Sequence, residues 1–331
     1  MGQKTHIAWT DATLNFWSGC TKVSAGCAHC YAETMAKRFA KIGKWGNGAK
    51  RQRHASAFKL ADKLNKEPWV CDECGESSPK NEGCPKCASA YQHRRRVFSL
   101  SLGDWLDEEA PIEWLAEMMD TIRRCPAIDF LLLTKRPENW CSRLRDAYVF
   151  LYRLERHSDR NKMIEDWHGG YPPLNVWLGV SVENQQAVDE RIPELIKIPA
   201  VVRFLSVEPM LEAIDFFRPW QNEVLTSRET MLEKIDWAIF GGESGPGARP
   251  CAVDWIRDGM RQCREAGVAP FVKQLGSNPL ETPSPVHVAD GNARPKTPSL
   301  PPLRLRDKKG GDPSEWPADL RVREFPKGRW T

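Results

Sequence analysis

Three cysteines near the start of the chain offer the ligands of a metal centre. They are Cys20, Cys27 and Cys30, in the segment N-F-W-S-G-C-T-K-V-S-A-G-C-A-H-C-Y. Three thiolates on one short, glycine-containing loop can bind three irons of a four-iron cluster and leave the fourth iron open to a ligand. The alternatives are a zinc site completed by His29 or by a distant residue, and buried thiols. Because a structural zinc site normally shows two close pairs of ligands, the single pair and separate cysteine favour iron and sulfur.

A second group of cysteines consists of two C-x-x-C pairs, Cys71 with Cys74 and Cys84 with Cys87. The residues that join the pairs are rich in Gly, Ser, Pro and Asn, so four thiolates can converge tetrahedrally without another core. We predict a structural zinc ribbon, with a second iron-sulfur cluster as the alternative. The following run, 91–96, holds an aromatic and three arginines that could meet a phosphate backbone, although a short charged run is more often a solvated face.

The other four cysteines lie outside both groups. Packed core thiols are the expectation for this set, which is Cys125, Cys141, Cys251 and Cys263. Cys251 is the exception, because it follows a glycine- and proline-rich segment near a predicted strand end. There it could donate a hydrogen atom or ligate a metal.

Length and composition fit an enzyme of ordinary size. With 331 residues, 41% hydrophobic and 28% charged, the chain can bury a large core and form about two domains or one barrel. The first residues lack the apolar core of a signal peptide, and no apolar run approaches the ~18 residues of a membrane-spanning helix. Paired spacings among the eleven cysteines favour metal in a reducing compartment over disulfides. We therefore expect a cytoplasmic protein, and the net charge of +4 is too small to add to this.

The elements that would position these residues alternate along the chain. Short apolar runs, each followed by a polar signature, predict strands at 97–102, 128–133, 176–180, 201–205, 235–240 and 268–272. Helical periodicity predicts helices at 112–124, 186–196 and 253–266. The segment 13–17 can serve as a first strand, with a helix at 31–39 after the cysteine loop. This alternation predicts an α/β fold with a parallel sheet whose site lies at the C-terminal strand ends.

Polar side chains recur at those strand ends, and we expect at least half of them to line one cavity. They are Asp104, Lys135, Arg136, Glu183, Asn184, Glu208, Glu243 and Lys273. The cysteine loop would lie over the mouth of the same barrel.

A series of motifs in order along the chain resembles the phage-associated three-cysteine-motif proteins, a radical-S-adenosylmethionine-like group. The segments are N-F-W-S-G-C, C-x-H-C-Y-A-E, L-L-T-K-R-P-E-N, N-V-W-L-G-V-S-V-E-N, F-L-S-V-E-P, G-G-E-S-G and F-V-K-Q-L-G, between residues 15 and 276. The resemblance implies a radical-SAM-type partial (β/α)6 TIM-like barrel with an inserted zinc ribbon and a C-terminal extension. The spacing departs from the C-x3-C-x2-C loop of the wider superfamily, since six residues separate Cys20 from Cys27.

The resemblance also implies cofactors and roles. A [4Fe-4S] cluster would bind S-adenosyl-L-methionine, whose reductive cleavage gives a 5′-deoxyadenosyl radical that abstracts a substrate hydrogen; structural Zn²⁺ would be separate. The cofactor-binding set would be Tyr31, Gly103, Asp104, Lys135, Arg136, Ser181, Glu183, Gly241 and Gly242. In it, Asp104 would accept from the methionyl ammonium, and Lys135 or Arg136 would pair with the carboxylate. The substrate-facing, catalytic set would be Glu208, Glu243, Lys273, Gln274 and Cys251.

The sequence does not identify the substrate. Our leading hypothesis is a nucleic-acid base, such as a hypermodified thymidine in phage DNA, rearranged by an isomerase or lyase in a bacterial host cell. The alternatives are a non-catalytic, zinc-dependent nucleic-acid-binding protein and a radical repair lyase for damaged DNA. An electron donor such as flavodoxin or ferredoxin would be the partner in the enzymatic cases.

Four segments are predicted. They are a first βα unit with the cluster loop at 1–66, an inserted zinc-ribbon knuckle at 67–93, the remainder of the barrel at 94–276, and a linker with a C-terminal tail at 277–331.

Overall fold

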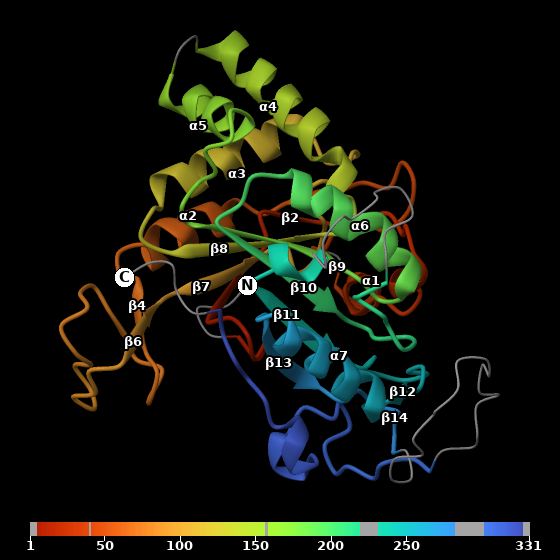
Figure 1. Cartoon of the computed structure of the whole chain (residues 1–331). Coiled ribbons are helices and arrows are strands. Elements are labelled where there is room, and N and C mark those ends of the chain that lie inside the picture. Colours follow the sequence, from red (N-terminus) through yellow and green to blue (C-terminus); the bar gives the residue numbers. More distant parts are fainter. Residues whose placement is uncertain (1–4, 40, 156–157, 219–230, 282–300, 327–331) are drawn as a thin grey trace, which may run out of the picture. The chain divides into compact units, whose positions relative to one another are not determined.

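The computed structural model describes residues 5–39, 41–155, 158–218, 231–281 and 301–326. The chain divides into two compact units (Figure 1). The first comprises residues 1–180 and 191–204, and the second comprises residues 181–190 and 205–331. No helix among the described residues is long and apolar enough to span a bilayer.

A seven-stranded sheet has the strand order β1-β7-β8-β9-β10-β11-β13. Its strands are β1 (Ala12–Leu14), β7 (Arg96–Ser99), β8 (Asp129–Thr134), β9 (Val176–Ser181), β10 (Val202–Val207), β11 (Trp237–Gly241) and β13 (Ala269–Gln274). The pairings β1–β7, β7–β8, β8–β9 and β11–β13 are parallel. These are the seven strands expected from the sequence, so the prediction of an α/β fold with a parallel sheet is confirmed at this level.

Two strand ends differ from the expectation for a local reason. The predicted first strand breaks after Leu14, because the Asn15 side chain turns to accept from the Leu102 backbone N–H at 2.8 Å. The chain then forms β2 (Trp17–Ser18), which pairs antiparallel with β3 (Gln52–Arg53). Strand β7 ends early because Leu100 has a φ of 66°, a left-handed conformation that no strand continues.

Helices of the first unit pack in a layer outside its strands. They are α1 (Tyr31–Arg38), α2 (Ala55–Leu64), α3 (Ile112–Arg124), α4 (Trp140–Leu154) and α5 (Asp159–His168). Figure 1 shows α3 between strand β8 and the α4–α5 pair. The predicted helix 112–124 is confirmed, since apolar positions three and four residues apart, such as Leu115, Met119 and Ile122, are buried on one face.

Two further helices lie in the later part of the chain. Helix α6 (Gln185–Lys197) begins after Asn184, whose side chain accepts from the Ala187 backbone N–H at 2.9 Å. Helix α7 (Val253–Glu265) follows β12 (Cys251–Ala252), which pairs with β14 (Pro279–Leu280). Both predicted helices are therefore present within one or two residues of the expected bounds.

The C-terminal tail packs on strand β13 within the second unit. The Val272 backbone N–H donates to the Val322 carbonyl at 2.8 Å, and the Trp237 indole N–H donates to the Glu324 carbonyl at 2.8 Å. Trp316, a residue of this tail, is buried. The tail thus covers an otherwise unpaired strand edge, while most of the predicted linker, 282–300, lies outside the described residues.

A small antiparallel sheet with the order β5-β4-β6 carries the C-x-x-C pairs. Its strands are β4 (Trp69–Cys71), β5 (Ser77–Ser78) and β6 (Gln92–Arg94). Because β6 leads directly into β7, this sheet is inserted between the cysteine loop and the second parallel strand. The four-segment division itself stays a prediction.

Candidate functional site

The four cysteines of the inserted sheet form a compact group of ligands. Their sulfur atoms all lie within 4.8 Å of one another, with 3.6 Å between Cys71 and Cys87 and 3.5 Å between Cys74 and Cys84. A tetrahedron of thiolates around zinc, with bonds of about 2.3 Å, has sulfur separations of about 3.8 Å. The residues therefore fit a metal ion such as zinc.

Backbone geometry holds this group in place. The Gly75 N–H donates to the Cys71 carbonyl, and the Ala88 N–H donates to the Cys84 carbonyl, each at 3.0 Å. Each donor follows the second cysteine of its pair and has a left-handed φ, 68° at Gly75 and 60° at Ala88. Hydrogen bonding from the Cys87 backbone N–H is the main cause that lowers the pKa of Cys84 to about 6, which favours the thiolate that metal binding needs.

The three-cysteine loop leaves β2 and ends at helix α1. Cys20 follows Gly19, Cys27 closes a 3-10 turn, and Cys30 is the residue before the first turn of α1. All three are free and partly exposed. Among the described residues, the compact group that could hold a single metal ion is the four-cysteine one, so the structure does not gather His29 with this trio.

Arg136 is the charged partner of the first cysteine. Its guanidinium donates to the Cys20 sulfur at 3.6 and 3.7 Å and to the Thr21 carbonyl at 2.6 Å. Burial raises the pKa of Cys20 to about 12, with the Asp104 charge adding to the rise and Arg136 opposing it. A cation at this position stabilises a sulfur ligand once it is ionised.

The Asp104 carboxylate holds Arg136 in place, and its positions for accepting hydrogen bonds are already occupied. Its carboxylate accepts from the Leu106 N–H, the Thr134 hydroxyl, the Lys135 N–H and the Arg136 guanidinium, at 2.7 to 3.1 Å. An ionised carboxylate has about four acceptor positions, so these four donors occupy it. In this structure Asp104 holds the loop after β8 rather than offering an acceptor, and the predicted contact with a methionyl ammonium would need one donor to leave.

Sequence reasoning missed a second buried ion pair beneath the loop. Arg51 donates to Asp107 at 2.7 Å and to the Thr21 hydroxyl at 2.8 Å, and both charged side chains are almost fully buried. Its remaining guanidinium N–H groups donate to the carbonyls of Gly46 and Ala49. The sequence signal was weak, because Arg51 and Asp107 stand in loops far apart in the chain.

The other predicted cofactor residues of the first unit have structural partners. Gly103 forms a parallel bridge with Gly19, and a Cβ there would lie 3.3 Å from the Gly19 carbonyl oxygen, so Gly103 allows the cysteine loop to pass close to β7. The Tyr31 hydroxyl donates to the Ser101 carbonyl at 2.6 Å. Lys135 is half-buried. The structure thus brings Cys20, Gly103, Asp104 and Arg136 into one neighbourhood.

The second unit holds the remaining predicted residues. Lys273 pairs with Glu208 at 2.9 Å, and both are partly buried at the ends of β13 and β10. The Gln274 amide donates to the Gly242 carbonyl at 2.9 Å. A Cβ on Gly241 would lie 2.5 Å from a Glu208 carboxylate oxygen, so that glycine makes room for Glu208. This neighbourhood contains the predicted substrate-facing set, and its role stays a prediction.

Several residues of the predicted substrate-facing and cofactor-binding sets are committed to packing. Glu243 accepts from the Arg249 backbone N–H at 2.8 Å and from its guanidinium at 2.6 Å, which fixes the loop after β11. Ser181 and Glu183 are buried, at 2% and 0% exposure. Burial raises the pKa of the Cys251 thiol to about 12. A Cβ on Gly242 would lie 2.2 Å from the Leu275 carbonyl oxygen, so close packing explains that glycine.

Two sequence expectations need correction. Cys125, Cys251 and Cys263 are buried as expected, but Cys141 is exposed on α4, because it lies on the outer face of that helix. The arginine run after the four-cysteine group is turned inward: Arg95 is buried and donates to the Glu67 carbonyl, and Arg96 pairs with Asp11. It therefore offers no continuous phosphate-binding patch.

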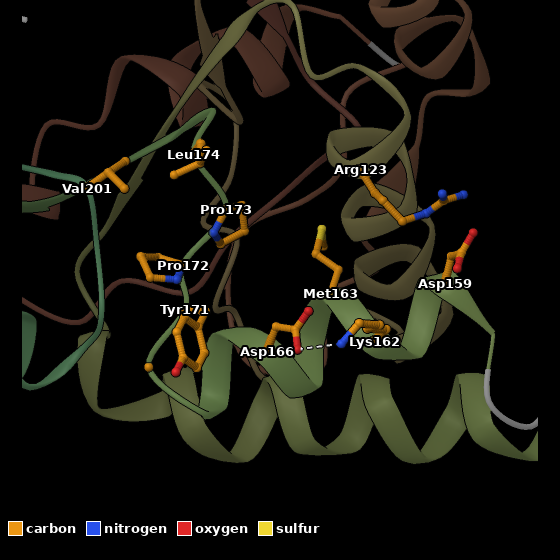
Figure 2. Close-up of a pocket in the computed structure, with 11 residues that line it drawn as sticks. Arg123, Asp159, Lys162, Met163, Asp166, Tyr171, Pro172, Pro173, Leu174 and Val201 are labelled. Carbon is orange, nitrogen blue, oxygen red and sulfur yellow. Dashed lines mark hydrogen bonds and ion pairs between the residues drawn. The ribbon is translucent and has the colours of Figure 1, made fainter. Parts of the chain in front are cut away.

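A hollow of about 630 Å³ lies elsewhere in the first unit, between α3, α5 and the segment leading to β9 (Figure 2). Figure 2 shows Tyr171, Pro172 and Pro173 on one side and Lys162, paired with Asp166, on the other. None of the predicted site residues lines it.

Comparison with known proteins gives a family without an assigned activity. A family model described as "Protein of unknown function (DUF5131)" matches residues 4–304. No curated protein and no solved structure matches the chain. Since the match covers nearly the whole chain, the protein belongs to the DUF5131 family.

Proposed function

We propose that this chain is a radical S-adenosylmethionine enzyme whose iron-sulfur cluster is bound by Cys20, Cys27 and Cys30. The observation that carries the proposal is the set of three free cysteines on the one loop that joins β2 to α1, with Arg136 against the first sulfur. When bound, the cluster and S-adenosylmethionine would supply a 5′-deoxyadenosyl radical for hydrogen abstraction.

The donor set fits such a cluster. Three thiolates bring negative charge to the loop, and two cations lie beside them. Arg136 contacts Cys20, while the pKa of Lys22 is raised, chiefly by its hydrogen bond with Glu33, with smaller contributions from Cys30 and Cys27. Cations beside sulfur ligands offset the charge of the ligated metal group.

The chain's own residues would then position and shield the site. Asp104 pairs with the Arg136 guanidinium, while the Thr134 hydroxyl donates to Asp104 and accepts from the Arg136 backbone N–H. Gly19 and Gly103 let the loop backbone lie against β7, and the Arg51–Asp107 pair fixes the base of the same loop. These contacts would keep the first sulfur oriented beside a fixed cation.

Anaerobic purification of the full chain tests the proposal. We expect about four irons in addition to one zinc, a brown protein, and reductant-dependent conversion of S-adenosylmethionine to 5′-deoxyadenosine. Cys27→Ser should lose the iron and this activity but keep the zinc. Cys141→Ser is the matched control, because Cys141 is exposed and outside both cysteine groups, and it should keep all three properties.

The same experiment addresses the substrate. We propose a base of a nucleic acid, and incubation with modified and unmodified DNA followed by nucleoside mass analysis should reveal a changed base. A colourless protein that holds only zinc would overturn the enzymatic proposal and favour a zinc-dependent binding protein.

A further inference from the structure

Helix α1 presents a row of large apolar side chains on its outer surface. Tyr31 and Met35 are 53% and 36% exposed, and their four-residue spacing places them on one face of the helix. Phe39, the residue that follows the helix, is 55% exposed. Val23, on the cysteine loop that precedes the helix, is 47% exposed. Isolated exposed apolar residues are common, but a contiguous group marks a surface that binds a partner.

The segment that contains this row carries an excess of positive charge. Between residues 22 and 50, six cationic side chains occur with a single carboxylate, that of Glu33. The six cations are all exposed, and they are Lys22, Lys37, Arg38, Lys41, Lys44 and Lys50. Glu33 is already paired with Lys22 at 2.7 Å. This excess of positive charge favours association with an acidic partner and speeds the encounter at low salt.

The same surface adjoins the cysteines directly. Cys30 is the N-terminal flanking residue of α1, so Tyr31 is joined to it by one peptide bond. A protein that docks on α1 therefore comes close to the three sulfurs. Electron transfer between proteins depends steeply on distance, and such complexes have small, transient interfaces.

We propose that α1 and residues 22–30 form the docking surface for a small acidic one-electron carrier protein of the flavodoxin or ferredoxin class. The inference rests on the proposed function, because the cluster must be reduced. In each transfer the reduced carrier would lose one electron and the cluster held by Cys20, Cys27 and Cys30 would gain it, with no atoms exchanged. We call this region, residues 22–39 together with the following loop residues 41–44, the α1 surface.

Single-stranded nucleic acid is the other ligand that cations and aromatics attract. It stacks bases on flat rings, whereas the centre of the α1 surface is Met35, an adaptable aliphatic side chain suited to protein contacts. An apolar centre with a charged rim is the usual arrangement of a protein–protein interface. These features favour the protein carrier.

Binding of the carrier to the full chain tests the inference without relying on activity. The variant is Arg38→Glu with Lys41→Glu, and the matched control is Lys59→Glu with Lys63→Glu, two exposed lysines of α2. Titration of each protein with oxidised flavodoxin at low ionic strength should give at least a tenfold higher Kd for the α1 variant. The control should bind like the unaltered chain, and the difference should shrink as salt is added, because the charges are exposed.

A second readout separates this inference from the proposed function. Dithionite reduces clusters without a docking protein, so the α1 variant should form 5′-deoxyadenosine normally with dithionite and at least tenfold more slowly with reduced flavodoxin. No product with either reductant from the unaltered chain would contradict the proposed function instead. Equal carrier binding by both double variants, or weakened binding of a single-stranded oligonucleotide but not of flavodoxin, would overturn the docking surface. Phe39→Ala, which keeps the charges, should raise the Kd about threefold.

Discussion

The two cysteine groups differ in how far the chain itself assembles them. In the inserted sheet, four sulfurs already lie within 4.8 Å of one another, and two backbone hydrogen bonds fix their loops. In the N-terminal loop, the sulfurs have separate neighbours, such as the Thr21 carbonyl at Cys20 and the Ser24 hydroxyl at Cys27. In that loop the chain holds a charge in place beside the sulfurs, because Arg136 is paired with Asp104.

This contrast has a chemical meaning. A structural zinc site uses all four ligands from the protein, so the chain can bring them together. A site that leaves one metal position open depends on the bound group to draw its ligands together, while the protein contributes oriented charge around it. We therefore expect the four cysteines of the inserted sheet to matter mainly for folding, and the three cysteines of the N-terminal loop to matter mainly for the proposed chemistry.

The largest expected effect concerns the zinc ligands. Cys84→Ser should remove the metal and with it a binding free energy of about 10 kcal/mol or more that holds the inserted sheet folded. Zinc content should fall to zero, and amide hydrogen exchange should become fast in residues 69–94 while the parallel sheet stays protected. If the inserted sheet stayed protected in the metal-free protein, the metal would not be needed to fold it, and the proposed difference between the two cysteine groups would be contradicted.

A smaller effect is expected for the ion pair beside Cys20. Arg136→Gln or Asp104→Asn alone leaves a buried partner without its counter-charge, at a cost of about 3 kcal/mol. The double variant should cost less than the sum of the two, because it removes both charges together. Urea unfolding of the zinc-loaded protein measures this coupling, and strictly additive costs would contradict the pairing.

Iron content separates the two roles of this pair. Arg136→Lys keeps a cation but loses the planar guanidinium that contacts Cys20, Thr21 and Asp104 together. We expect it to fold but to retain less iron after anaerobic gel filtration, with zinc unchanged. Full iron retention would mean that Arg136 supports only the fold.

The sequence predicted the elements better than the contacts within the site. Strands and helices followed from periodicity, and the C-x-x-C spacing alone predicted the four-cysteine group. Arg136 was assigned to a cofactor carboxylate, yet it contacts Cys20, which is 116 residues away in the chain. Arg51 and Asp107 stand in loops with no periodic signal, so only the fold brings them together.

Burial explains other differences as well. The run 91–96 resembles an exposed basic patch in sequence, but β6 leads straight into the core strand β7, so Arg95 and Arg96 are drawn inward. A glutamate following a strand looks available for a ligand, yet Glu243 binds the Arg249 side chain of its own loop. Local composition does not reveal which polar groups satisfy one another.

Asp129 of β8 pairs with Arg94 of the inserted sheet, and its burial predicts that the stability of the fold depends on pH. Burial raises the pKa of Asp129 to about 6, although Arg94 lies 3.1 Å away and opposes the shift. The folded state therefore holds the proton more tightly than the unfolded state, where the pKa is near 3.8. The stability contributed by this group is present below pH 4 and is lost as the pH rises through 6.

Asp129→Asn removes that titration. Its free energy of unfolding relative to the unaltered chain should rise by about 2 kcal/mol between pH 4.5 and pH 7.5. Parallel urea titrations of the two proteins measure this difference. Any loss of zinc at low pH lowers the stability of both proteins equally, so it does not change the difference between them. A relative stability that falls over this range would mean that the ion pair with Arg94 outweighs burial.

The smallest expected effect tests how the backbone preassembles the four-cysteine group. Gly75 and Ala88 occupy equivalent left-handed positions, where a Cβ costs about 1 kcal/mol. A Cβ on Gly75 would meet no heavy atom within 4 Å, so Gly75→Ala should destabilise the zinc-bound sheet through backbone strain alone. Ala88→Gly should stabilise it by about 0.5 kcal/mol, since relief of strain exceeds the entropy gained by the unfolded chain. Zinc competition titrations measure both, and shifts of the same sign would show that these loops do not act as matched halves of one preformed site.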